Sequence, residues 1–284
     1  MDLTWWSLAL GAAVAWGSAD FLAGLAAQRA RFIAVVFGVQ SVGLLVVLPF
    51  WMLYDRTWRI DEYMVAAGLA MVCGLSALYR GLARGPVRIV APVSALGAGI
   101  PVLYGALTGE DLSLVRAAGA VLALLGIVTV TAGESAAEGG TRPGAVAAVL
   151  HGAGAALGLG AAVVLLGLGG PAAPFASVGT VRLTAAAFAG AALVLGARSE
   201  RCTKDVVAPR ALGPVLGAGV LDCAANIAFV LAAQRGAVGL SGLLASLYPA
   251  VTVVLGVLVL GERLTRWQVG GLGLVFAGVV LLRF

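Results

Sequence analysis

The chain has 284 residues, of which 61% are hydrophobic and only 11% are charged, and its mean hydropathy is +1.05. Soluble globular domains carry about 25% charged residues, so this chain cannot cover a water-facing surface and we expect it to lie in a lipid bilayer. Its formal net charge of +5 comes from arginines between the apolar segments, so we expect no nucleic-acid partner.

The sequence predicts an all-α membrane protein with ten transmembrane helices. A span requires about 20 mainly apolar residues, and ten segments meet this requirement. The first starts near Trp5 without a signal-peptide cleavage site, so we expect it to be retained as a span. The ten expected spans are residues 5–27, 32–54, 62–83, 87–107, 113–133, 143–168, 174–197, 211–233, 237–260 and 266–283.

Two segments in the two halves of the chain match each other and indicate an internal duplication. They are Ala91–Leu112 and Leu243–Leu264, and the ten spans divide five and five at the polar, glycine-rich segment Glu134–Arg142. We therefore expect two units, at residues 1–135 and 143–284. Since five is odd, the second unit enters the membrane from the opposite side, as in the inverted repeats of many secondary transporters. The alignment pairs Ser94 with Ser246, Gly97 with Pro249, and Gly109-Glu110 with Gly261-Glu262.

The second of these segments resembles the ending of an EamA domain, the building block of the drug/metabolite transporter (DMT) superfamily. The resemblance rests on A-S-L-x-P at Ala245–Pro249, L-G-E-R-L at Leu260–Leu264, and a G-V-V-L-L ending at Gly278–Leu282. The first copy departs from this pattern, with Gly97 in place of the proline. The resemblance implies a transporter of small metabolites, amino acids or drugs, and it does not say which of these is carried.

The orientation in the membrane stays open between two readings. Counting Lys and Arg by alternate connections gives 12 on the side of the first connection, five on the side of the termini, and Arg182 inside a span. The positive-inside rule then places both termini outside, whereas the resemblance implies cytoplasmic termini.

Four ionisable residues lie within the predicted spans: Asp20, His151, Arg182 and Asp222. Such residues are costly at membrane depth and commonly mark a substrate or ion pathway. Asp222 has Asn226 one turn later on the same helix face, and a carboxyl that exchanges a proton there is the simplest device for proton coupling. A structural hydrogen bond, or an ion pair with Arg182, is the alternative.

Asp20 lies one turn after Trp16 on the same face of the first span. A carboxylate beside an aromatic ring is suited to hold a cationic group, and the same carboxylate is also suited to carry a proton. The alternative is an ion pair with an arginine of the first connection, such as Arg29. The Trp16-Gly17 pair also resembles the W-G that first helices of EamA domains commonly carry.

Arg182 begins an R-x-x-x-A pattern that resembles the second helix of EamA domains, and Gln40 takes its place in the first copy. Arginine stays charged, so at this depth it needs an anion: Asp222, Asp20 or a substrate carboxylate, unless its stem reaches the interface. His151 is the only histidine. It is suited to relay a proton, and a hydrogen bond between helices is the alternative.

The resemblance places the substrate cavity between the central helices, which here carry Ser94, Ser246, Tyr248 and Tyr79. The two serines hold matching places just ahead of the position that Pro249 occupies in the second copy. A proline leaves one carbonyl without its amide partner, and such an opening is tolerated at membrane depth where it lines a cavity or packs on protein.

We expect a secondary transporter with alternating access in a cell membrane, driven by protons or by exchange, and the resemblance implies that it exports its small-molecule substrate. The chain has no G-x-x-x-x-G-K-[S/T] motif for a nucleotide and no C-x-x-C pair among its three cysteines, so we expect no cofactor and no metal. Because one chain holds both halves, we expect a monomer. Two alternatives are an intramembrane enzyme acting on a lipid or prenyl phosphate and a membrane subunit that transports nothing.

Overall fold

The computed structural model describes residues 3–55, 61–84, 87–110, 113–137, 145–197, 209–261 and 263–282, and the regular elements among them are helices. The first half contains α1 (Leu3–Ala27), α2 (Phe32–Phe50), η1 (Trp51–Asp55), α3 (Glu62–Arg84), α4 (Val87–Ala95), η2 (Leu96–Ala98), α5 (Gly99–Leu107) and α6 (Leu114–Ala137). The second half contains α7 (Ala145–Gly169), η3 (Gly170–Ala172), α8 (Pro174–Ala197), η4 (Pro209–Ala211), α9 (Leu212–Arg235), α10 (Val238–Ala245), α11 (Tyr248–Leu260) and α12 (Arg266–Leu282).

The helices make ten membrane crossings. Eight segments of the described residues are long and apolar enough to cross a membrane, and α3 and α12 contribute two shorter apolar helices, Glu62–Leu78 and Arg266–Leu282. The expected all-α fold, with ten transmembrane helices in two inverted five-helix units, is therefore confirmed.

Two of the crossings are broken near their middle. The fourth passes from α4 through the single 3-10 turn η2 into α5, and the ninth passes from α10 into α11 at Ser246 and Leu247. Pro249 follows in the first turn of α11, where its missing N–H would have had no helical partner anyway. Irregular backbone at membrane depth must be covered by protein, and both residues at the second break are indeed buried.

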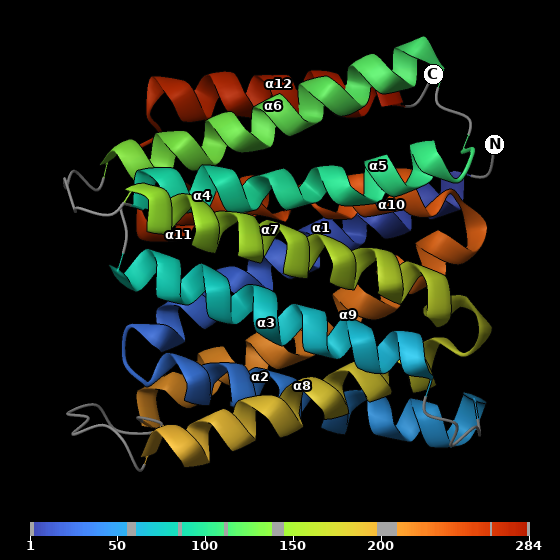
Figure 1. The fold of residues 1–284 in the computed structure, drawn as a ribbon, viewed down its shortest axis with the longest axis vertical. Helices are drawn as coiled ribbons and strands as arrows, with labels where there is room; N and C mark the ends of the chain where they lie inside the picture. The colour runs from blue at the N-terminus through green and yellow to red at the C-terminus, as the bar shows by residue number, and fades with distance from the viewer. Residues whose placement is uncertain are drawn as a thin grey trace.

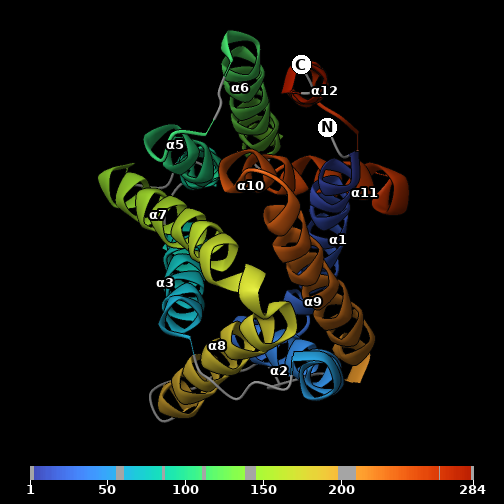
Figure 2. The same ribbon diagram turned by 90° about the vertical axis from the view of Figure 1, so that its right-hand side faces the viewer.

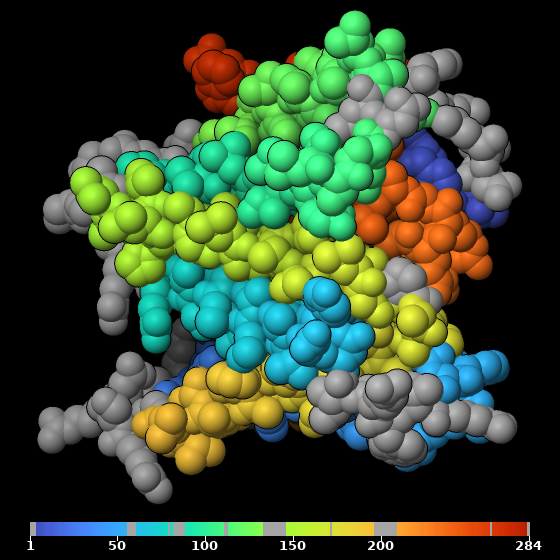
Figure 3. All heavy atoms as spheres, turned by 45° about the vertical axis from the view of Figure 1, so that its right-hand side comes forward, coloured from blue at the N-terminus to red at the C-terminus, as the bar shows by residue number. Residues whose placement is uncertain are grey.

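The helices form a ring with two paired ends and two walls. In Figure 1 they run side by side, with α6 and α12 packed together at one end of the molecule and α2 with α8 at the other. The end-on view in Figure 2 shows α3 beside α7 on one flank and α1 beside α9 on the opposite flank. Figure 3 shows α3 and α7 covering one face between α6 and α8. The two flanks are the walls between which a cavity can form.

The contact between α6 and α12 displays the inverted repeat directly. A Cβ added to Gly119 would lie 2.9 Å from the carbonyl oxygen of Gly278, and one added to Gly126 would lie 2.8 Å from that of Gly271. A shift of 152 residues maps Gly119 onto Gly271 and Gly126 onto Gly278, so the two contacts exchange with each other. Such self-complementary contacts are typical of a twofold axis, and small residues permit the close approach.

A second pair of equivalent contacts joins α3 to α8 and α9 to α2. A Cβ on Gly68 of α3 would lie 3.0 Å from the carbonyl oxygen of Val181 on α8, and one on Gly219 of α9 would lie 2.9 Å from that of Val39 on α2. These contacts are images of each other when α3 is shifted by 151 residues onto α9 and α2 by 142 residues onto α8. The same approximate twofold axis therefore relates the helices at both ends of the ring.

The broken crossings show a register that differs by one residue from the sequence alignment. A Cβ on Gly17 would lie 2.6 Å from the carbonyl oxygen of Tyr248, and one on Gly160 would lie 2.6 Å from that of Gly97. Gly97 therefore corresponds to Tyr248, and its predicted pairing with Pro249 is wrong by one residue.

The extra residue lies in the last turns of α11. α5 ends at Leu107, two residues before the left-handed Gly109, whereas α11 continues to the residue directly before the left-handed Gly261. An alignment anchored on these two glycines cannot detect the difference. The predicted pairing of Ser94 with Ser246 is shifted in the same way.

Candidate functional site

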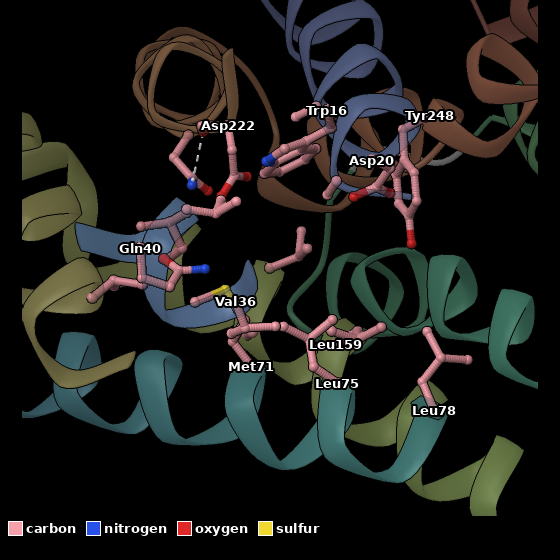
Figure 4. Close-up of a pocket in the computed structure, with 18 of the residues that line it drawn as sticks. Trp16, Asp20, Val36, Gln40, Met71, Leu75, Leu78, Leu159, Asp222 and Tyr248 are labelled. Carbon is pink, nitrogen blue, oxygen red and sulfur yellow. Dashed lines mark hydrogen bonds between the residues drawn. The ribbon is translucent and has the colours of Figure 1, made fainter. Parts of the chain in front are cut away.

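A cavity of about 180 Å³ lies between the two walls of the ring. This volume is below the roughly 300–1,000 Å³ of pockets that take drug-sized ligands, so the cavity fits a smaller molecule. Figure 4 shows its interior. The lining comes from α1 (Trp16, Ala19, Asp20, Ala23), α2 (Phe32, Val35, Val36, Val39, Gln40), α3 (Ala67, Met71, Leu75, Leu78), α7 (Leu159, Ala162, Val163, Leu166), α8 (Val181), α9 (Asp222, Asn226) and α11 (Tyr248).

The cavity extends toward one end of the bundle and is closed at the other. Ala23, Phe32 and Leu78 carry the lining toward the end that holds the connection between α1 and α2. Toward the end that holds the connection between α2 and α3, apolar side chains of six helices pack into a closing cluster. This closing cluster contains Ala12, Val47, Met64, Leu166, Val178, Phe229 and Val230.

A carboxylate and two aromatic rings form the polar side of the cavity. Asp20 is exposed although it lies within a membrane-spanning helix, because its side chain faces the cavity. Trp16 lies one turn earlier, its ring centroid is 6.4 Å from that of Tyr248 in an edge-on arrangement, and Phe229 backs it at 5.8 Å. In Figure 4 Asp20 and Tyr248 project toward the same space. Within the described part of the chain, Asp20 makes no ion pair or hydrogen bond, including with Arg29.

The second acid of the cavity is neutralised by an arginine. Nη1 of Arg182 donates to a carboxylate oxygen of Asp222 and also to Oε1 of Gln40, at 2.7 Å in the latter case. The Arg182 side chain is fully buried, and that of Asp222 is 18% exposed. Of the anions that the sequence left open for Arg182, the structure therefore shows Asp222. The arginine itself does not reach the cavity surface.

Gln40 and Arg182 also mark the axis of the repeat. The shift of 142 residues between α2 and α8 maps Gln40 onto Arg182, and these two side chains hydrogen-bond to each other. A residue contacts its own image only close to a twofold axis. The ion pair of Arg182 with Asp222 thus breaks the symmetry of the molecule near its axis, since Gln40 carries no charge.

The opposite side of the cavity is apolar. Met71, Leu75 and Leu78 on α3 and Leu159 on α7 face the space from below in Figure 4. These residues were not among the predicted site residues, because apolar side chains in a membrane span carry no signal that separates a cavity from a lipid contact. Met71 and Leu75 have the same four-residue spacing as Asp222 and Asn226. This spacing is the one sequence feature that could have indicated that they line the cavity.

The remaining predicted site residues divide into three groups. Asn226 lines the cavity, and its Nδ2 donates to the backbone oxygen of Asp222 at 3.1 Å. Ser94, Ser246 and His151 are absent from the lining: the hydroxyl of Ser94 donates to Ala91 and Nδ1 of His151 lies 2.6 Å from the backbone oxygen of Ala147. Tyr79 belongs to α3, but its side chain lies outside the described residues.

The described residues contain no group of three His, Cys, Asp or Glu side chains that is suited to hold a metal ion. Cys73 is exposed and Cys223 is buried, and neither forms a disulfide. The polar and aromatic side chains of the described cavity lining are Asp20, Trp16, Tyr248, Gln40, Asn226, Phe32 and the neutralised Asp222.

Comparisons with known proteins agree with this architecture. A family model described as "EamA-like transporter family" matches residues 3–132 and 146–284. A solved structure titled "Crystal structure of protein" superposes with a TM-score of 0.82 at 18% sequence identity, covering 99% of this chain and 98% of that one. At this identity the likeness shows the fold alone. No curated protein matches the sequence.

Proposed function

The chain belongs to the EamA-like transporter family, and from this premise we propose that it is a secondary active transporter that moves a small molecule by alternating access. The observation that carries the proposal is the cavity between two inverted five-helix units, which extends toward one end of the bundle and is closed at the other. In a protein built from inverted repeats, the two units can swap conformations, which closes the open end of the cavity and opens the closed end.

The proposed coupling ion is a proton carried by Asp20. An unpaired carboxylate inside a membrane protein is unfavourable unless it binds a proton or a cation. The other titratable groups in the described lining are Asp222 on α9, which is paired with Arg182, and Tyr248 on α11. The lining residues from α2, α3 and α7 carry no charge and do not titrate. Asp20 is therefore the carboxylate of the cavity that is free to exchange its proton.

We propose that the transporter works as a monomer in a cell membrane. Both inverted units belong to one chain, and the cavity between them is lined from both, so no second copy is needed to complete the site. The proposed direction of transport is export, and it rests on the resemblance to the family alone.

Thiol labelling tests alternating access without knowledge of the substrate. Cys73, Cys202 and Cys223 are first replaced by serine. Val36→Cys, in the cavity, should react with a membrane-impermeant maleimide added on the side of the α1–α2 connection. Met64→Cys, buried in the closing cluster, should react from the opposite side if that end opens.

Ile127→Cys provides the matched control, because Ile127 is as buried as Met64 but lies on α6 in a different cluster of buried residues. It should stay unreactive from either side. A rigid subunit that transports nothing would label at Val36→Cys and never at Met64→Cys, and this result would refute the proposal. Trans-stimulated exchange of labelled solutes in proteoliposomes then identifies what is carried.

A further inference from the structure

We propose that the substrate is a small monovalent organic cation with an apolar body, bound by the Asp20 carboxylate beside the Trp16 and Tyr248 rings. The inference rests on the proposed transport function and adds the chemical class of the solute. It follows from the charge of the cavity, from the two rings, and from the apolar wall that faces them.

The described lining carries one net negative charge. Its charged residues are Asp20 and Asp222, and the charge of Asp222 is cancelled by Arg182. Arg182 is fully buried behind that pair and does not reach the cavity surface, so it is not available to an anionic solute. A monovalent cation neutralises the site in place of the proton, whereas an anion adds a second negative charge to the cavity and an uncharged molecule gains no ionic attraction.

The aromatic rings add selectivity for an organic cation over a small inorganic one. Trp16 and Tyr248 stand edge-on to each other at 6.4 Å, so the two rings are not stacked face to face. An alkylammonium group between a carboxylate and a tryptophan face gains both ionic and cation–π attraction. Phe229 packs against Trp16, with ring centroids 5.8 Å apart, and holds the indole in place.

The apolar wall supplies the place for the hydrocarbon part of the cation. Met71, Leu75, Leu78 and Leu159 face the acid across the cavity (Figure 4). Methionine adapts its shape to different partners, and leucine side chains favour apolar groups. With a volume of about 180 Å³ the cavity accepts a compact molecule.

The test uses three probes of nearly the same shape and different charge. They are choline, dimethylbutanol, in which carbon replaces the charged nitrogen, and the dimethylbutanoate anion. Binding to the purified full-length protein is measured by titration calorimetry. We expect choline to bind at least about tenfold more tightly than the alcohol, the size of effect that an ion pair together with a cation–π contact produces, and the anion not to bind.

Variants assign the effect to the carboxylate. Asp20→Asn should weaken choline binding at least about tenfold, whereas Asp20→Glu, which keeps the charge, should retain most of it. Trp16→Leu should lower the affinity several-fold. Asp61→Asn is the matched control, because it removes one acid that lies outside the cavity lining, and it should bind choline as the wild type does.

Three results would overturn the inference. These are tighter binding of the anion or of the alcohol than of choline, choline binding that is unaffected by Asp20→Asn, and a wild type that binds no cation while it exchanges an anionic or uncharged solute. In the last case the transport function stands and only the solute class is wrong. If Met64→Cys never labels and no solute is exchanged, the transport function itself fails.

Discussion

The two walls of the cavity occupy equivalent positions in the repeat and carry opposite chemistry. A shift of 143 residues maps the α1 lining (Trp16, Ala19, Asp20, Ala23) onto the α7 lining (Leu159, Ala162, Val163, Leu166), residue for residue. The shift of 151 residues maps Met71 and Leu75 of α3 onto Asp222 and Asn226 of α9. The backbone is therefore symmetric at the site, and the polar side chains stand on one wall only.

This difference separates what the fold requires from what the site requires. The glycine contacts that hold the helices together recur in both halves, because each half must pack in the same way. The acids do not recur, so the fold can form without an acid at those positions. It follows that the polar wall can be exchanged for its apolar counterpart, provided that no buried charge is left alone.

The largest effect is expected at the ion pair between Arg182 and Asp222. Asp222→Met, which copies the residue at the equivalent position in α3, leaves a fully buried guanidinium without its carboxylate and should lower the free energy of unfolding by about 3–5 kcal/mol. Adding Arg182→Gln, which copies Gln40, removes the unpaired charge and should restore most of that loss. Unfolding in detergent, followed by tryptophan fluorescence, measures the double-mutant cycle.

Equal stability of the single and double variants would contradict this expectation, because it would show that an unpaired Arg182 does not lower the free energy of unfolding. The double variant should also keep the cavity, because both replacements are residues that the other half already accommodates. Its affinity for choline should stay close to that of the wild type, since Asp20 is untouched.

The next effect concerns the symmetric part of the molecule. A Cβ on Gly126 would lie 2.6 Å from the backbone nitrogen of Val275, and one on the equivalent Gly278 would lie 2.6 Å from that of Ala123. Backbone cannot give way as a side chain can, so Gly126→Ala and Gly278→Ala should each destabilise the protein by about 1–3 kcal/mol. The two losses should be alike, because the contacts are images of each other.

Gly273→Ala on α12 is the matched control for these variants. Nothing lies within 4 Å of a Cβ at Gly273, and alanine is the better helix former by up to about 1 kcal/mol. The control should therefore melt at the same or a higher temperature. A large difference between Gly126→Ala and Gly278→Ala would show that the axis does not pass between α6 and α12.

The sequence predicted the crossings, and it singled out two acids that the structure places in the cavity lining, because both features depend on composition along the chain. Asp20 and Asp222 stand out in apolar spans, and the duplication implied the inverted fold. The sequence could not choose the partner of Arg182, since the choice depends on how α8 and α9 face each other. It could not detect Met71 or Leu159 either, because a leucine that faces a cavity and one that faces lipid look alike along the chain.

A weaker effect is expected when the acid is moved to the other wall. Val163 occupies the position on α7 that Asp20 has on α1. Asp20→Val should abolish choline binding, and adding Val163→Asp should bring it back to within about tenfold of the wild type, because charge attraction is restored without the aromatic pair. Titration calorimetry compares the three proteins. Failure of the double variant to bind would mean that the rings, and not the charge, dominate recognition.

The smallest effect is expected at the closed end of the bundle, where a residue of the first half forms a hydrogen bond with α10 of the second half. The Glu110 carboxylate accepts a hydrogen bond from the backbone N–H of Gly239 at 2.9 Å and thereby caps the first turn of α10. A lost cap costs about 1 kcal/mol, which corresponds to about a fivefold change in an equilibrium. If this contact forms only while the end is closed, Glu110→Ala should raise the labelling rate of Met64→Cys about fivefold, and Glu110→Gln, which keeps an acceptor oxygen, should raise it less. An unchanged labelling rate together with a lowered melting temperature would assign Glu110 to the stability of the fold and not to the opening of this end.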